Sequence, residues 1–321
     1  MTRHRPQFRQ NLPQLSDKLF LTDGGLETTL CFIDGIDLPE FAAFDMLKDD
    51  AGVARLLDYF DDYVELAHRY GAGFILESVT WRANGDWSDK IGYSRQQLAD
   101  FNRKSIDMLL AVRDRYQTPD NPFVISGCIG PRGDGYWPDA QMSAADAQAY
   151  HQEQITLFAD TPADMVSALT LNYPEEATGI CLAAAQADIP AAISFTVETD
   201  GKLPNGDTLQ SAIEAVDDAT DGYAAYYMIN CAHPTHFDDV LTGKGVWQNR
   251  LRGIRANASR KSHAELDESE TLDQGDPVEL GTLNAKLKQT LPHLTIFGGC
   301  CGTDHRHVDE IGKSCAPLFR L

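Results

Sequence analysis

The sequence is poor in positive charge. It contains 27 Lys and Arg against 48 Asp and Glu, which gives a formal charge of −21 at pH 7. Nucleic acids and anionic membranes are bound through clustered positive charge, so we expect neither as a partner. No apolar run approaches the roughly 20 residues of a membrane span. The basic start, Met1 to Pro6, is followed by no apolar stretch, so we expect no secretory signal.

Cysteine is also scarce, with seven in 321 residues. An odd number of cysteines without a leader points to a reducing, cytoplasmic setting rather than to a disulfide scaffold. No glycine-rich phosphate-binding pattern is present, which leaves nucleotide cofactors unsupported. The hydrophobic content of 43% is enough for a large core. We expect one domain over residues 1–321, with residues 1–16 as an N-terminal extension.

Three of the cysteines form a pattern typical of a metal site. Cys300 and Cys301 are adjacent within Gly298–Thr303, directly after an apolar run, and Cys231 ends another apolar run. The flanking glycines allow the backbone to turn so that both neighbouring sulfurs face one ion. Three thiolates suit tetrahedral zinc and leave its fourth position open, as in catalytic sites. The spacing matches no zinc finger or ribbon.

The simpler alternative is that these cysteines are core residues, since free cysteine is among the most buried residue types. That alternative is favoured for Cys231 taken alone. Two thiols at consecutive, oppositely pointing positions beside three glycines are unusual in a core, which favours a zinc site for Cys300 and Cys301. If this pair binds zinc, Cys231 is expected to be the third ligand. We expect Cys128 not to be a ligand. The remaining cysteines, expected to serve packing, are Cys31, Cys181 and Cys315.

Short apolar runs alternate with longer amphipathic stretches, which is typical of βα units on a parallel sheet. Helical patterns run from Asp50 to Tyr70 and from Ser94 to Tyr116. Ser143 and Ser211 resemble the first residues of capping boxes, although Ser211 fits equally well inside a helix. Eight such units predict an α/β fold, a single (β/α)₈ barrel, with an open doubly wound sheet as the alternative. The predicted strands are residues 19–22, 74–78, 123–126, 164–169, 191–196, 225–230, 251–256 and 294–297.

Glycines, polar residues and cysteines follow the predicted strands, at the end where barrel enzymes have their active sites. The sixth and eighth strands, which carry the cysteines, are one strand apart in a barrel and within reach of one ion. The segments concerned include Asp23–Gly25 after the first strand, Thr80–Arg82 after the second, Asn230–Cys231 after the sixth, Asn257 after the seventh and Cys300–Cys301 after the eighth.

The order of these segments resembles that in the zinc-dependent homocysteine S-methyltransferases. This family includes betaine-, S-methylmethionine- and methylfolate-dependent members. The resemblance implies a (β/α)₈ barrel that holds Zn²⁺ through Cys231, Cys300 and Cys301. It also implies transfer of a methyl group from a cationic donor to the zinc-bound thiolate of homocysteine, giving methionine. The matching segments are Asp23–Leu30, Gly127–Pro131, Ser194–Thr196, Asn230–Cys231 and Gly298–Thr303, of which the last is the most specific.

Zinc supplies the chemistry in this hypothesis. A free thiol has a pKa of about 8.5, and coordination to zinc favours the nucleophilic thiolate. The sulfur would then attack a methyl carbon on S-methylmethionine, S-adenosylmethionine or betaine, without a general base from the protein. No folate or cobalamin domain fits within this length, so we expect direct transfer. The sequence does not specify the donor or the oligomeric state, and a homo-oligomer is one option.

Asp23 is the first candidate for binding the ammonium group of the acceptor, and Gly24 and Gly25 would admit the ligand close to the backbone. The alternative is a tight turn with a helix-capping aspartate. Asn230 would orient Cys231 or would only satisfy the end of a strand. Each further candidate has an ordinary strand or turn role as its alternative. These further candidates for contact with substrate are Thr80, Ser194, Thr196 and Asn257.

One residue departs from the family pattern. Leu169 stands where relatives commonly carry a glutamate that helps to hold the amino-acid end of homocysteine, and a leucine cannot bind an ammonium group. The acceptor is then homocysteine held differently, or another thiol or selenol without that amino group. The acidic segment 262–276 is expected to be a solvated excursion after the seventh strand, with a lid as one option.

Two other classes of function stay open. The first is a barrel that uses the same zinc as a Lewis acid for lyase or hydrolase chemistry. The second is a non-catalytic zinc or thiol sensor. Histidines near the cysteines would suit a mixed Cys/His site, but we expect them at the starts of helices. They are His233, His236, His305 and His307.

Overall fold

The computed structural model describes residues 5–137, 141–243 and 245–319. Within these ranges eight parallel strands pair in chain order, and β8 pairs with β1 to close a barrel. The strands are β1 (Phe20–Leu21), β2 (Gly73–Glu77), β3 (Phe123–Ile129), β4 (Met165–Leu171), β5 (Ala191–Phe195), β6 (Tyr226–Asn230), β7 (Leu251–Ala256) and β8 (Ile296–Gly299). The (β/α)₈ barrel is therefore confirmed, and the open sheet is excluded.

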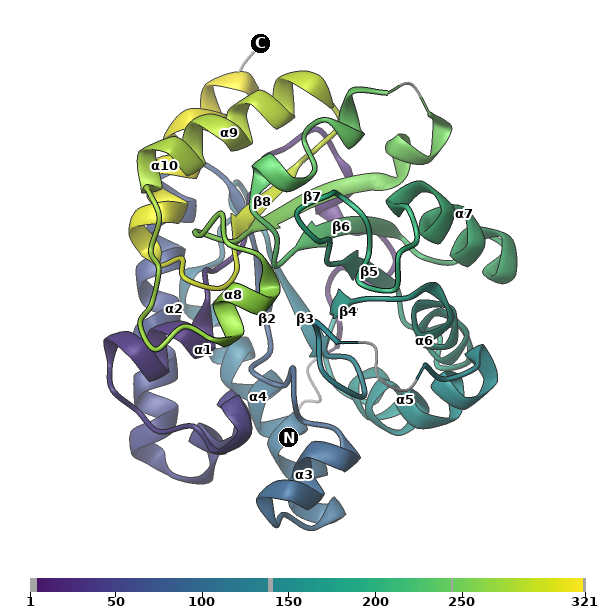
Figure 1. The fold of residues 1–321 in the computed structure, drawn as a ribbon. Coiled ribbons are helices and arrows are strands. Elements are labelled where there is room, and N and C mark those ends of the chain that lie inside the picture. The colour runs from purple at the N-terminus through teal and green to yellow at the C-terminus, as the bar shows by residue number, and fades with distance from the viewer. Residues whose placement is uncertain (1–4, 138–140, 244, 320–321) are drawn as a thin grey trace.

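Helices surround the strands, as Figure 1 shows. They are α1 (Leu26–Thr28), α2 (Asp50–Tyr70), α3 (Gly85–Ile91), α4 (Arg95–Tyr116), α5 (Ala144–Ala159), α6 (Pro174–Gln186), α7 (Leu209–Thr220), α8 (His263–Asp267), α9 (Pro277–Thr290) and α10 (His305–Cys315). None of the helices in the described ranges is long and apolar enough to cross a membrane.

Local sequence signals account for the helix ends. The side chain of Asp49 caps α2, and Gly71, with φ of 64°, ends it in the left-handed region that favours glycine. Ser94 opens α4 with a capping box, and Ser143 caps α5. Of the two interpretations of Ser211, the capping box is wrong and the place inside a helix is confirmed, because Thr208 caps α7 and Ser211 lies in its first turn.

The predicted strand starts agree with the structure to within two residues. Three strands run further than predicted: β3 pairs with β4 through Ile129, β4 pairs with β5 through Leu171, and β8 pairs with β7 through Gly299. The β4–β5 register shifts between Ala168 and Leu171. Thr170, inside this irregularity, has φ of 64°, so the strand end is bent by a residue that rarely adopts this conformation.

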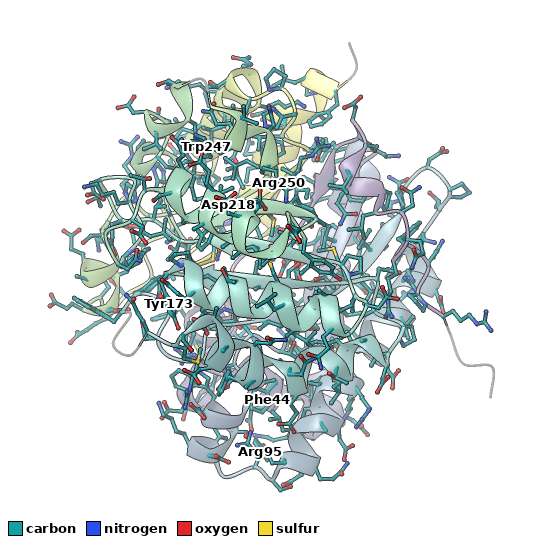
Figure 2. All side chains as sticks on the ribbon, turned by 90° about the vertical axis from the view of Figure 1, so that its right-hand side faces the viewer. Phe44, Arg95, Tyr173, Asp218, Trp247 and Arg250 are labelled. Atoms are coloured by element: carbon teal, nitrogen blue, oxygen red, sulfur yellow. A yellow bond between two sulfur atoms is a disulfide. The ribbon has the colours of Figure 1, made fainter. Side chains whose placement is uncertain are left out.

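Within the described residues, the buried hydrophobic side chains form two clusters. Inward-facing residues such as Ile75, Val124 and Met228 fill the barrel, and a larger cluster lies between strands and helices. Outside the barrel, Phe44, labelled in Figure 2, packs on Tyr93 with ring centroids 5.9 Å apart. This contact anchors the loop that precedes α2.

The predicted N-terminal extension packs against the bottom of the barrel. Phe8 and Leu12 contact the inner cluster. The backbone N–H groups of Gln7 and Phe8 donate to Asp164 Oδ1, at 2.6 and 2.8 Å. Asp164 is fully buried and also pairs with Arg113 at 2.9 Å. The N-terminal ends of the strands are thus closed, and the open end lies at their C-termini.

Candidate active site

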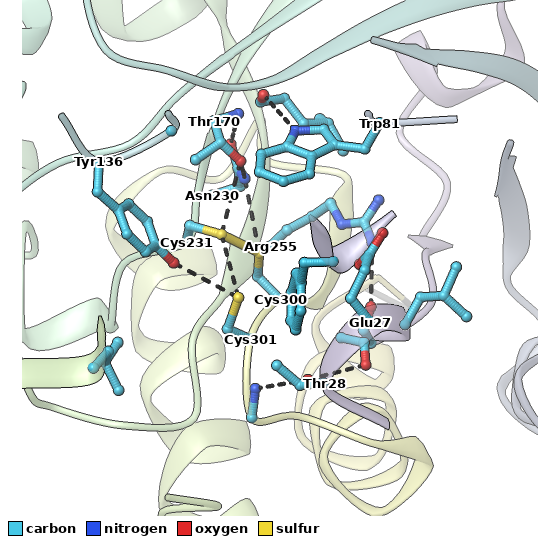
Figure 3. Close-up of a pocket in the computed structure, with 18 of the residues that line it drawn as sticks. Glu27, Thr28, Trp81, Tyr136, Thr170, Asn230, Cys231, Arg255, Cys300 and Cys301 are labelled. Carbon is cyan, nitrogen blue, oxygen red and sulfur yellow. Dashed lines mark hydrogen bonds between the residues drawn. A yellow bond between two sulfur atoms is a disulfide. The ribbon is translucent and has the colours of Figure 1, made fainter. Parts of the chain in front are cut away.

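The C-terminal ends of the strands surround a cavity of about 370 Å³, part of which is shown in Figure 3. Residues in or after every strand except β5 contribute to its wall, together with residues from the segment 262–276. Seven of the predicted site residues line this cavity: Asp23, Gly24, Gly25, Asn230, Cys231, Cys300 and Cys301. Four others are buried beside it without lining it: Thr80, Ser194, Thr196 and Asn257.

The sulfur atoms of Cys231, Cys300 and Cys301 converge, all lying within 4.8 Å of one another. Cys231 and Cys300 form a disulfide in the structure, with Cα atoms 5.4 Å apart. The sulfur of Cys301 lies 3.9 Å from that of Cys231 (Figure 3). Reduction of the disulfide would give three thiols that face one point.

The donor set fits a tetrahedral metal. Zinc–sulfur bonds of about 2.3 Å in a tetrahedron put neighbouring sulfurs about 3.8 Å apart, close to the separation between Cys231 and Cys301. Burial raises the pKa of the Cys301 thiol to about 11, so a thiolate there requires a nearby cation. Within the described ranges, these three cysteines are the group of His, Cys, Asp or Glu side chains that lie closely enough together to hold a metal. No histidine belongs to this group.

Cys231 reaches this position through a strained turn. Its φ is 54°, which is uncommon for a residue other than glycine. Three side chains surround its carbonyl oxygen: Asn257 Nδ2 donates at 3.0 Å, Thr196 Oγ1 donates at 3.3 Å, and His263 Nε2 lies at 2.8 Å. These contacts hold the turn in place, so Thr196 and Asn257 position the backbone of Cys231 and with it the sulfur atom.

Asn230 connects the sulfurs to the strands behind them. Its Oδ1 accepts from the hydroxyl of Ser194 at 2.6 Å and from the N–H of Thr170 at 2.9 Å. Its Nδ2 donates to Thr170 Oγ1 at 2.8 Å and lies 3.8 Å from Cys300 Sγ. Thr170 Oγ1 in turn lies 3.8 Å from Cys231 Sγ. Asn230 therefore contacts the sulfur of Cys300 rather than that of Cys231, the partner predicted from the sequence.

The glycines of the β1–α1 turn allow close packing against the cysteine loop. A Cβ on Gly24 would lie 2.7 Å from Tyr63 Oη, and a Cβ on Gly25 would lie 2.5 Å from the carbonyl oxygen of Cys300. The N–H of Gly25 donates to the carbonyl of Thr303 at 3.0 Å. Side chains at these positions would push the two loops apart.

Asp23 is already bonded within the protein. Arg255 Nη2 donates to its Oδ1 at 2.6 Å, and Tyr59 donates to its Oδ2 at 3.0 Å. Burial raises the pKa of Asp23, and the charge of Arg255 opposes that rise. Because both carboxylate oxygens have protein partners, the wall of the cavity carries an ion pair at this point rather than a free carboxylate.

The comparisons with known proteins decide the family. Residues 20–315 match the profile of the homocysteine S-methyltransferases. The chain belongs to this family. The resemblance seen in the sequence is thereby confirmed.

Curated relatives and solved structures agree with this family. The methionine synthase of Mycobacterium tuberculosis is 24% identical in an alignment 334 residues long that covers 96% of this chain and 26% of that protein. The methionine synthase of Mycobacterium leprae is 25% identical over 95% of this chain and 25% of its own length. The chain thus spans about a quarter of these relatives.

The homocysteine methyltransferase MmuM of Escherichia coli has the same fold. Its metallated form superposes with a TM-score of 0.71 at 19% identity, covering 95% of this chain and 98% of MmuM. Its oxidised form gives a TM-score of 0.72 at 18% identity, covering 96% and 99% of the two chains.

The acidic segment of this family member lies over the cavity. It begins with α8, and Leu266, Asp267 and Asp273 from it line the wall. His263 fixes the start of α8: besides its contact with the Cys231 carbonyl, its Nδ1 lies 2.9 Å from Glu198 Oε1. Its ring stacks on Tyr136 with centroids 3.9 Å apart. The segment is therefore attached to the same turn that presents a sulfur atom.

Several residues of the site were not predicted from the sequence. Tyr136 places its hydroxyl 3.6 Å from Cys301 Sγ, and it comes from a loop without a recognisable motif. Thr170 and His263 contact Cys231 from positions far away in the sequence, so no local pattern marks them. Arg255 did carry a signal, as did Glu77, because each is a charged residue in a buried, otherwise largely apolar strand.

The remaining cysteines and most of the nearby histidines take the predicted structural roles. Cys181 and Cys315 are buried in the outer core, and Cys31 is partly buried against it. Cys128 lines the cavity but lies outside the sulfur trio. Three histidines lie at the starts of helical segments, as predicted: His233 caps the short turn Pro234–His236, and His305 and His307 lie in the first turn of α10. His236 instead ends the short turn.

Proposed function

We propose that this protein is a zinc-dependent S-methyltransferase that moves a methyl group from a cationic donor to the thiol of homocysteine, giving methionine. The observation that carries the proposal is the convergence of three sulfurs within 4.8 Å at the wall of the cavity. A zinc ion held by Cys231, Cys300 and Cys301 would lower the pKa of the incoming thiol and favour its nucleophilic thiolate. Since the site needs free thiols, we infer a reducing, cytoplasmic setting.

The residues of the chain divide into those that contact the acceptor and those that support them. We assign contact with the acceptor to Gly24, Gly25 and Asn230, and to Asp23 as part of its ion pair with Arg255, because these residues line the cavity. The assignment of a supporting role rests on hydrogen bonds to Asn230, to the Cys231 carbonyl and to the Cys128 carbonyl. The supporting residues are Thr80, Ser194, Thr196 and Asn257.

A cationic donor suits the acidic and aromatic residues that line the cavity. Glu27, Asp134 and Asp267 contribute carboxyl groups to its wall, where Arg82 pairs with Asp134, and the rings of Trp81 and Tyr136 attract sulfonium or quaternary ammonium groups. We therefore keep S-methylmethionine, S-adenosylmethionine and betaine as candidate donors. The attacking sulfur and the methyl carbon would be held in line by this wall and the sulfur trio, and such positioning supplies much of the acceleration.

The test is a direct assay. The protein is reduced, loaded with zinc and incubated with homocysteine and each donor, and methionine is measured by mass spectrometry. Methionine formation supports the proposal and identifies the donor. If zinc is bound and no methionine forms, other thiols and selenols are supplied with the same donors, because Leu169 lines the cavity and favours an acceptor without an amino group as the second candidate. Turnover without a methyl donor would overturn the proposal in favour of Lewis-acid chemistry.

A further inference from the structure

Glu77, at the C-terminal end of β2, is a buried carboxylate without a hydrogen-bond partner. It lines the cavity and is 5% exposed. Neither Oε1 nor Oε2 makes a hydrogen bond within the described residues. A buried carboxylate left without partners costs several kcal/mol, so such a group in a folded protein calls for an explanation.

Elsewhere the fold satisfies a buried carboxylate completely. Asp164, at the closed end of the barrel, is 0% exposed. Its two oxygens accept from the N–H groups of Gln7, Phe8 and Ile125 and from Arg113, at 2.6 to 2.9 Å. Both oxygens of Asp164, which serves the fold, are therefore bonded, whereas Glu77 at the open end keeps its oxygens available.

The nearest cation does not neutralise Glu77 through a bond. Arg255 Nη1 lies 4.0 Å from Oε1, beyond hydrogen-bond distance. The other donors of Arg255 are used by Asp23 and by the carbonyl of Gly299, at 2.6 and 3.2 Å. Burial raises the pKa of Glu77 to about 7, although Arg255 and the nearby hydroxyl groups of Ser126 and Ser167 oppose the rise. An additional cation beside Glu77 would stabilise the ionised form.

The location suits the amino end of the acceptor. Arg255 joins Glu77 to the backbone of Gly299, one residue before Cys300. Leu169, also in the wall, offers no charge, and both oxygens of Asp23 are occupied. Among the cavity-lining carboxylates of the described chain, Glu77 combines full burial with unpartnered oxygens.

We propose that Glu77 binds the α-ammonium group of the acceptor thiol and so selects acceptors that carry an amino group. This inference rests on the proposed function, because it assumes that the acceptor sulfur lies at the cysteine trio. Glu77 takes no part in bond making; it holds the acceptor so that its sulfur faces the donor. It also explains how the site can accept homocysteine with a leucine at position 169.

The test compares Glu77→Gln with the parent protein on two acceptors, homocysteine and 4-mercaptobutanoate, which is homocysteine without its amino group. Loss of a buried charge pair should lower kcat/KM for homocysteine about 100-fold, mainly through KM. With 4-mercaptobutanoate the two proteins should differ by less than about threefold. The matched control is Glu27→Gln, which removes another cavity carboxylate whose pKa burial raises to about 7, and which should leave the ratio between the two acceptors unchanged.

Equal losses on both acceptors would assign Glu77 a structural role and overturn the proposal. No loss on homocysteine, or a selective loss in Glu27→Gln alone, would overturn it as well. Calorimetric binding of both thiols to the zinc-loaded proteins is measured in parallel. If no donor supports methylation, the proposed function fails, while the ratio of the dissociation constants still decides the role of Glu77; absence of binding by either thiol would overturn both.

Discussion

The unpaired carboxylate of Glu77 should make the protein less stable as the pH rises from about 4.5 to about 7, and Glu77→Gln should remove that effect. Burial moves the pKa of Glu77 from 4.5 to about 7 in the folded state. Between these two pH values the unfolded chain loses the proton and the folded chain keeps it. The folded state then binds more protons, so the free energy of unfolding falls as the pH rises through this window.

The size of the effect follows from the shift. Integrating over the two titrations, this carboxyl costs about 1 kcal/mol at pH 5 and about 3 kcal/mol at pH 8. An unfolding entropy of about 2 cal/mol/K per residue converts these values for a chain of this length. Without substrate, Glu77→Gln should therefore melt about 1 °C higher than the parent at pH 5 and about 4 to 5 °C higher at pH 8.

Thermal melting of the reduced proteins at both pH values measures this difference. The control is Glu153→Gln, since Glu153 is exposed on α5 and its replacement should shift the melting temperature equally at the two pH values. A melting difference for Glu77→Gln that does not grow between pH 5 and pH 8 would refute the reasoning, because the carboxyl would then be ionised in the folded protein at ordinary pH.

Three further predictions concern the metal site and the fold. Cys300→Ser should abolish tight zinc binding, measured as metal content after dialysis of the reduced protein; unchanged content would refute the site. Gly25→Ala should weaken zinc binding about tenfold or more, because its Cβ would lie 2.5 Å from the Cys300 carbonyl, whereas Gly133→Ala, with open space around it, should not. Asp164→Asn should lower the free energy of unfolding by about 3 kcal/mol or more, because it leaves Arg113 buried without its partner; denaturant titration with less than about 1 kcal/mol of change would contradict this role.

Local patterns were sufficient to predict the strands and the sulfur trio. The strands were found because each is a short apolar run between turn signals, and the cysteines because they follow two such runs. The contacts that position these groups were beyond the sequence. Arg255 and Asp23 are 232 residues apart and meet only when β7 and β1 are placed in one barrel. His263 reaches the Cys231 carbonyl from a segment that the sequence identified only as acidic.

The order of strands in the closed barrel separates the metal site from the recognition site. Cys231 follows β6, and Cys300 follows β8, while Glu77 and Leu169 lie on β2 and β4. Replacement of a charged residue on β4 therefore changes the wall that faces the acceptor without moving the sulfurs. If Glu77 on β2 supplies the negative charge that a glutamate on β4 gives in relatives, the methyl-transfer chemistry stays the same while the residue that selects the acceptor lies on a different strand. The comparison of homocysteine with 4-mercaptobutanoate tests directly whether Glu77 has this role.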